Sequence, residues 1–136
     1  MPISVPRSVG QIPVYYNKKA PQSHDYVEMS ASPLYPFGYG LSYTSFDYSD
    51  LHLSALTPRS FEVSFKVRNT GKYDGEEVAQ LYLRDEYASV VQPLKQLKHF
   101  ARLFLKCGEE QEVKFILSEE DFALVDRNLK RVVESG

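Results

Sequence analysis

The chain has 136 residues, of which 43% are hydrophobic and 25% charged, and its formal net charge is −2. These values are typical of one globular domain and argue against wholesale disorder. No block of four or more basic residues occurs, so no nucleic-acid partner is expected. The longest unbroken apolar stretch, residues 122–125, is far too short to span a bilayer, and neither a signal peptide nor a membrane partner is expected.

Residues 1–33 differ in composition from the rest of the chain. Five prolines punctuate them, and each disfavours a helix interior and a central strand position. Residues 12–16 alone could pair as a short strand. The following residues, 17–33, are polar and indicate a linker, which either lies on another surface or is disordered without one.

An aromatic segment follows at residues 34–43, with the sequence LYPFGYGLSY. No helical or strand period fits it, and Gly38 and Gly40 favour positive φ, so we expect an ordered loop. Three roles are open for this loop: a hydrophobic plug at one end of the fold, a docking surface for another domain, or a sugar-stacking platform. We favour docking, because the proline-rich, polar segment before the loop is typical of a tether, and the domain at the far end of that tether is the one that the loop would contact.

Alternating apolar and polar residues then predict six short strands. The first, residues 46–56, changes phase near Asp50, and residues 94–106 contain a phase change that indicates a bulge. Residues 118–121 resemble a capping box and predict one helical turn. Residues 126–128 form a hairpin-like corner. The expected strands are 46–56, 61–67, 77–87, 94–106, 113–117 and 129–133.

This spacing predicts an all-β, immunoglobulin-like antiparallel sandwich that lacks its last strand. The missing strand would leave residues 129–133 as an unpaired sheet edge, which predicts self-association by edge pairing or domain swapping, or poor solubility.

The residue types that commonly act in catalysis or metal binding form no recognisable site motif in this sequence. No zinc-ligand spacing, nucleophile elbow or cofactor motif occurs, so we expect no catalytic residue, metal or cofactor in this chain. His24, His52 and His99 are expected to be structural or exposed. Cys107 has no neighbour in sequence that would activate its thiol.

Several motifs together resemble glycoside hydrolase family 3, the β-glucosidase and β-xylosidase family. Residues 33–46, PLYPFGYGLSYTSF, resemble the opening segment of its C-terminal domain, and residues 6–16 resemble the last stretch of the preceding α/β domain. Further motifs stand in the same order: VRNTG at 67–71, GEEVAQLYLRD at 75–85, PLKQLKHF at 93–100 and LKCGE at 105–109. Two positions depart from the pattern, with Cys107 in place of a proline and His99 in place of a small residue.

The resemblance implies a fibronectin type III-like sandwich at residues 34–136, truncated at its C-terminus, after an α/β remnant at 1–16 and a linker at 17–33. It implies a non-catalytic scaffold that packs on the catalytic domains of a parent enzyme, which hydrolyses terminal β-linked glycosyl residues with retention. The docking candidates are Tyr35, Pro36, Phe37, Tyr39, Leu41 and Tyr43.

Other properties stay open at this point. A freestanding carbohydrate-binding or adhesion module is the alternative function, because fold does not fix function. The compartment is unknown from this chain, although the resemblance favours a secreted or periplasmic parent over a cytoplasmic one.

Overall fold

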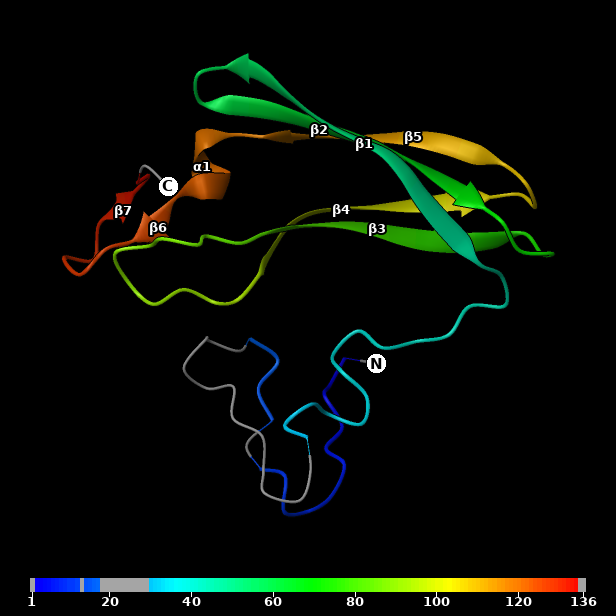
Figure 1. Ribbon diagram of the computed structural model, residues 1–136, viewed down its shortest axis with the longest axis horizontal. Coiled ribbons are helices and arrows are strands. Elements are labelled where there is room, and N and C mark those ends of the chain that lie inside the picture. Colours follow the sequence, from blue (N-terminus) through cyan, green and yellow to red (C-terminus); the bar gives the residue numbers. More distant parts are fainter. Residues whose placement is uncertain (1, 13, 18–29, 135–136) are drawn as a thin grey trace. The chain divides into compact units, whose positions relative to one another are not determined.

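The computed structural model describes residues 2–12, 14–17 and 30–134, which belong to two units (Figure 1). The N-terminal unit comprises Met1–Leu41 and Arg84–Gln96, and the sandwich unit comprises Ser42–Leu83 and Leu97–Gly136. The division into 1–16, 17–33 and 34–136 stays a prediction, and residues 18–29 of the expected linker lie outside the described residues.

One layer of the sandwich unit is a three-stranded antiparallel sheet in the order β1-β2-β5. Its strands are β1 (Phe46–Thr57), β2 (Ser60–Asn69) and β5 (Glu110–Leu117). The β2–β5 register runs from Phe61 opposite Leu117 to Arg68 opposite Glu110. Because side chains alternate between the two faces of a sheet, this register turns the apolar residues of both strands, except Ile116, to one side.

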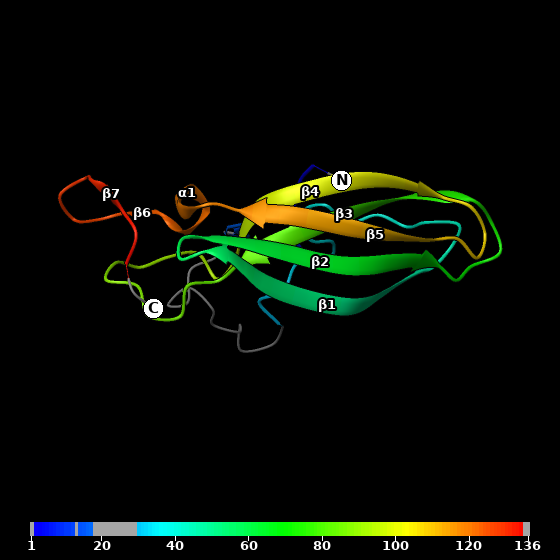
Figure 2. The same cartoon turned by 90° about the horizontal axis from the view of Figure 1, so that it is seen from above.

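The second layer consists of β3 (Gly75–Leu83) and β4 (Gln96–Leu105), which pair with each other. In Figures 1 and 2 this pair lies against the three-stranded sheet. The all-β sandwich is therefore confirmed. Its core is made by apolar residues of both layers: Val63, Phe65, Val67, Ala79, Leu103, Leu105, Val113, Phe115 and Leu117.

Two predicted irregularities are confirmed. Asp50 has a φ of 54°, and the β1–β2 register shifts between Ser49 and His52, which is the expected phase change. The short helix α1 (Glu119–Phe122) begins after Ser118, whose backbone N–H donates a 2.8 Å hydrogen bond to the carboxylate of Asp121. This is the expected capping arrangement.

The predicted corner at residues 126–128 is also confirmed. It joins β6 (Leu124–Val125) to β7 (Arg131–Val132), which pair in antiparallel fashion. The carboxylate of Asp126 accepts 2.8 Å hydrogen bonds from the backbone N–H groups of Asn128 and Lys130. These bonds hold the pKa of Asp126 below its usual value, and the bond from Lys130 contributes most.

Three expectations need correction. Strand β3 ends at Leu83 rather than at residue 87, because the consecutive charged residues 84–86 offer no apolar side chain to the core. Within the described part of residues 12–16 no strand forms; instead Val5 makes an isolated antiparallel bridge to Tyr35. Gly40 does not adopt positive φ, whereas Gly38 does. The bulge within 94–106 stays a prediction.

In the described ranges no helix is long and apolar enough to cross a membrane.

Candidate docking surface

The aromatic segment of the N-terminal unit is organised around a tight turn. The backbone N–H of Tyr39 donates a 3.0 Å hydrogen bond to the carbonyl of Pro36, and Gly38 has a φ of 81°. A positive φ at the third residue of a turn is typical of type II geometry and favours glycine. The turn brings the rings of Tyr35 and Tyr39 to a centroid distance of 4.8 Å.

A second aromatic contact anchors the tip of this turn. The ring of Phe37 lies 4.4 Å from that of Tyr16, between centroids, in a tilted arrangement. Such pairs contribute about 0.5–1.5 kcal/mol beyond the area that they bury. Two ring pairs therefore hold the side chains of this turn within the N-terminal unit.

Gln11 braces the backbone that leads into the turn. Its side chain is 1% exposed, and its Oε1 accepts a 2.6 Å hydrogen bond from the backbone N–H of Arg7. Its Nε2 donates to the carbonyls of Ser30 and Ser32, at 3.0 and 2.9 Å. The guanidinium of Arg7 adds a 2.9 Å bond from Nε to the same Ser32 carbonyl. One buried amide thus fastens residues 7–11 to residues 30–32.

The bridge between Val5 and Tyr35 continues this bracing toward the aromatic turn. The N–H of Val5 donates to the carbonyl of Tyr35 at 2.8 Å, and the N–H of Leu34 donates to the carbonyl of Val5 at 2.8 Å. The backbone just before the turn is therefore hydrogen-bonded to a segment 30 residues earlier.

The turn displays much of its aromatic surface. Tyr35, Phe37 and Tyr39 are 39%, 48% and 38% exposed. Pro36 is exposed too, and Leu41, the last residue of this part of the unit, is 88% exposed. An aromatic residue that is half-exposed but fixed in position is typical of binding surfaces, because little conformational entropy is lost when it is covered.

Tyr43 belongs to the sandwich unit and is 96% exposed. The six candidates are therefore divided: Tyr35, Pro36, Phe37 and Tyr39 share one turn, Leu41 follows it, and Tyr43 lies in the other unit. The docking role of all six stays a prediction at this point.

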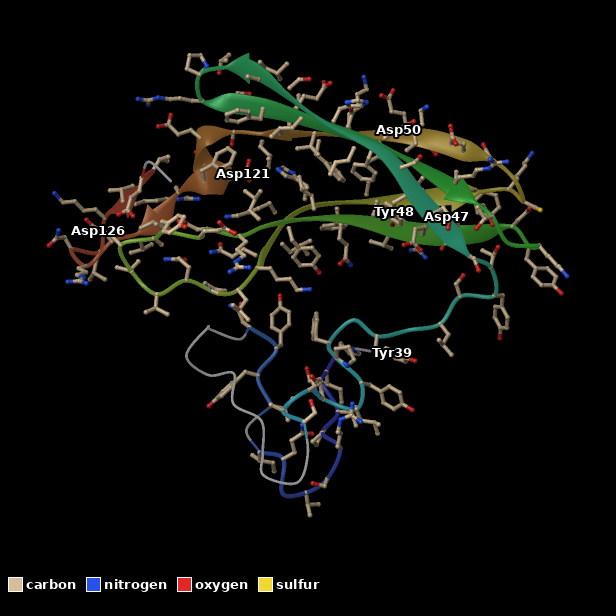
Figure 3. The ribbon with its side chains drawn as sticks, viewed as in Figure 1. Tyr39, Asp47, Tyr48, Asp50, Asp121 and Asp126 are labelled. Atoms are coloured by element: carbon tan, nitrogen blue, oxygen red, sulfur yellow. The ribbon has the colours of Figure 1, made fainter. Side chains whose placement is uncertain are left out.

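The sandwich unit contains a separate polar contact between its two sheets. The hydroxyl of Tyr48 on β1 donates a 2.8 Å hydrogen bond to the carboxylate of Glu77 on β3, and Figure 3 shows Tyr48 directed from β1 toward β3. Burial, and then the hydrogen bond and charge of Glu77, raise the pKa of the Tyr48 phenol well above its usual value. The group stays a neutral donor.

The histidines make no cluster in the part of the chain that is described. His52 lies on β1 opposite Ser64, and His24 falls outside the described residues. His99 stacks on Phe115 with a centroid distance of 5.7 Å, and its Nε2 lies 3.4 Å from the Asp121 carboxylate without a well-formed hydrogen bond. Among the described residues, no three His, Cys, Asp or Glu side chains gather as metal ligands.

Gln11 and Arg7 were not identified from the sequence. Their roles depend on carbonyl groups 19 to 25 residues away, and no local spacing marks a buried glutamine before such partners are known. Tyr16, which contacts Phe37, was expected only as part of a short strand.

The comparisons with known proteins agree with this architecture. Residues 77–136 match the family model described as a fibronectin type III-like domain. A putative β-xylosidase of Formosa agariphila is 42% identical over 140 residues, covering 100% of this chain and 18% of that protein. A periplasmic β-glucosidase of Salmonella typhimurium is 43% identical over 150 residues, covering 100% of this chain and 20% of that protein.

Solved structures give the same result. A β-glucosidase from Erythrobacter marinus superimposes with a TM-score of 0.87 at 42% identity, covering 96% of this chain and 18% of that one. A β-glucosidase from Listeria innocua in complex with glucose superimposes with a TM-score of 0.85 at 37% identity, covering 99% and 21%. The chain spans about a fifth of the length of the curated relatives that it matches.

Proposed function

Because this chain carries a fibronectin type III-like domain and matches a fifth of β-glucosidases and β-xylosidases of glycoside hydrolase family 3, we propose that it is the accessory domain of such an enzyme. Its role is to pack on the catalytic domains and brace them. The parent enzyme hydrolyses terminal β-linked glycosyl residues with retention of configuration. The chain itself contributes scaffolding rather than the reacting groups.

The docking element is the aromatic loop, residues 34–43. The observation that carries this assignment is the turn at 36–39, whose rings are fixed by Tyr16 and by the Tyr35–Tyr39 pair yet stay about half-exposed. A plug in a hydrophobic core would bury these rings. Aromatic anchors on a braced backbone are instead typical of the centre of protein–protein interfaces.

A chimera tests this function. The matching segment of the Salmonella typhimurium periplasmic β-glucosidase is replaced by this whole chain, and β-glucoside hydrolysis and thermal inactivation are measured. We expect an active chimera. Phe37→Ser together with Tyr39→Ser should lower its inactivation temperature by several degrees, because about 2 kcal/mol or more of interface energy is lost with such anchors.

Tyr87→Ser is the matched control, because Tyr87 is 81% exposed and lies in the same unit as Phe37 and Tyr39. An inactive parent chimera would contradict the accessory role. Equal effects of the loop variant and the control would contradict the docking role of the loop. Saturable binding of the free chain to a β-glucan would favour the carbohydrate-binding alternative.

Self-association is a further part of the proposal. Strand β7 pairs with β6 on one side, and Leu129 and Val133 near it are 86% and 45% exposed. An apolar strand edge of this kind is a template for pairing with a second copy. Leu129→Lys should then shift the free chain toward monomer in sedimentation velocity, and a chain that is already monomeric at high concentration would contradict it.

A further inference from the structure

The two outer faces of the sandwich unit differ in chemistry. On β2 and β5 the register places polar residues on the outward face, with Ile116 as the exception. Ion pairs lie on this face, between Lys66 and Asp50 at 2.8 Å and between Lys114 and Glu112 at 3.6 Å. This is the face of a sheet that is solvated.

The outward face of β3 and β4 instead carries large apolar residues beside the polar Glu76, Gln80 and Arg102. Val78 and Tyr82 on β3 are 41% and 39% exposed, and Phe100 and Phe104 on β4 are 68% and 58% exposed. Strand alternation accounts for their direction, because the intervening Ala79, Leu103 and Leu105 are buried in the core. We call these four exposed residues the outer aromatic face.

A polar pair lies within this face. Arg102, which is placed between Phe100 and Phe104 along β4, forms an ion pair with Glu76 on β3. The pair joins the two strands on their outward side, so the apolar residues on either side of it belong to one surface. Exposed apolar residues that adjoin one another around a small polar centre are typical of an interaction site, whereas single exposed apolar residues are common on any protein surface.

We infer that the outer aromatic face is a second docking surface, and that its occupant is the catalytic part of the same glycosidase. This inference rests on the proposed accessory function. About four fifths of each curated relative lies outside the region that this chain matches, so a large protein surface is available to cover the face. Strand β3 ends at Leu83 and β4 begins at Gln96, and residues 84–95 between the two strands belong to the N-terminal unit.

The chemistry of the face favours a protein occupant over a sugar. Phe100 and Phe104 offer rings without a hydroxyl, and Arg102 and Glu76 already satisfy each other. The hydroxyl of Tyr82 already donates a 2.6 Å hydrogen bond to Oε1 of Gln80. An oligosaccharide needs several polar partners in addition to a stacking ring. A partly apolar protein surface, with polar groups facing the ion pair, fits the face better.

The test replaces Phe100 and Phe104 with threonine, which keeps β-propensity but removes the apolar surface. Ile116→Thr is the matched control, because Ile116 and Phe104 are both 58% exposed and lie on opposite outer faces. Each variant is measured in the free chain by urea unfolding and in the β-glucosidase chimera by thermal inactivation. We expect the double variant to leave the urea midpoint unchanged and to speed inactivation of the chimera by about tenfold, as loss of an interface anchor would.

Ile116→Thr should change neither measurement. The inference is overturned if the Phe100/Phe104 variant behaves like the control in the chimera, or if it unfolds the free chain. Two other results also overturn it: a dimer of the free chain that the variant dissociates, and binding to a β-glucan that the variant abolishes. If the Phe37/Tyr39 variant still destabilises the chimera, only the second surface is wrong; if neither variant does, the proposed function fails as well.

Discussion

The hydroxyl of Thr44 donates a 2.6 Å hydrogen bond to Oδ1 of Asn69, so the residue that leads into β1 is tied to the residue that ends β2. Asn69 is fully buried, and its Nδ2 donates to the carbonyls of Tyr73 and Leu105 at 2.8 and 3.0 Å. The backbone N–H of Gly71 completes the set with a 3.1 Å bond to Oδ1. The side chain thereby uses its full hydrogen-bonding capacity.

Asn69→Ala should therefore lower the free energy of unfolding by about 2–4 kcal/mol, because it removes the side-chain partner of two carbonyls and two donors. Urea denaturation followed by far-UV circular dichroism measures the loss. Asn128→Ala is the control, since Asn128 is exposed, and should cost well under half of this. Similar losses for the two variants would show that burial of the Asn69 amide is not decisive.

Gly71→Ala should be destabilising for steric reasons. A Cβ at Gly71 would lie 2.0 Å from Oγ1 of Thr44 and 2.6 Å from the backbone nitrogen of Ser45. Backbone atoms cannot move aside cheaply, so we expect a loss of about 1–3 kcal/mol, as for other overpacked sites. Gly38→Ala differs because no atom lies within 4 Å, and its cost comes from its positive φ alone.

In the combined variant Gly71→Ala/Thr44→Ala the nearest clashing oxygen is absent. The combined variant should lose less stability than the sum of the two single losses. A double-mutant cycle measures this difference as a coupling free energy between the two positions. Strict additivity of the two losses would contradict the steric explanation.

The carboxyl group of Asp121 makes the stability of the folded chain depend on pH. Partial burial acts to raise the pKa of its carboxyl, but hydrogen bonds from the N–H and hydroxyl of Ser118, and the nearby His99, outweigh burial and lower it. Since the folded pKa is below the unfolded value of about 3.9, the stabilisation is fully present above that value and is lost as pH falls through the folded pKa.

Asp121→Asn should consequently reduce stability at pH 7 by about 1 kcal/mol, the usual worth of a helix-capping interaction, and flatten the pH profile below pH 4. Urea midpoints measured from pH 2 to pH 7 check both effects. A variant whose profile keeps the slope of the original chain would assign the acid sensitivity to other carboxylates.

Gln11→Ala should loosen the backbone that leads into the aromatic turn. The N–H of Arg7 and the carbonyls of Ser30 and Ser32 would lose their side-chain partner. We expect hydrogen exchange at Val5, Leu34 and Tyr35 to become at least about fivefold faster. The reason is that local opening of this segment costs less free energy once the hydrogen bonds of the Gln11 side chain are gone. Exchange in β2 serves as the internal control, and unchanged protection at Tyr35 would show that Gln11 does not brace the turn.

Local patterns were sufficient for much of the sandwich. The alternation at Phe61, Val63, Phe65 and Val67 predicted β2 and its core face, and the phase change predicted the irregularity at Asp50. In these segments each side chain's direction follows from its neighbours in sequence. The same is true of the capped turn after Ser118.

Other features depend on distant partners and could not be predicted in this way. Gln11 and Asn69 resemble surface amides locally, and their burial results from carbonyls 19 to 36 residues away. Phe100 faces outward, whereas Ala101 and Leu103 of the same strand contact the core. Which face of a strand is covered depends on the opposite sheet, and no local period specifies that.

The interleaving of the two units has a consequence for synthesis on the ribosome. The sandwich unit begins at Ser42, is interrupted by Arg84–Gln96, and resumes at Leu97. Thus the N-terminal unit lacks its second segment until Gln96 has emerged from the ribosome, and by then β1, β2 and β3 have emerged as well. These strands must wait for β4 and β5 before their core closes. The nascent chain therefore carries two unfinished units at once, and the order of translation ties the maturation of one to the other.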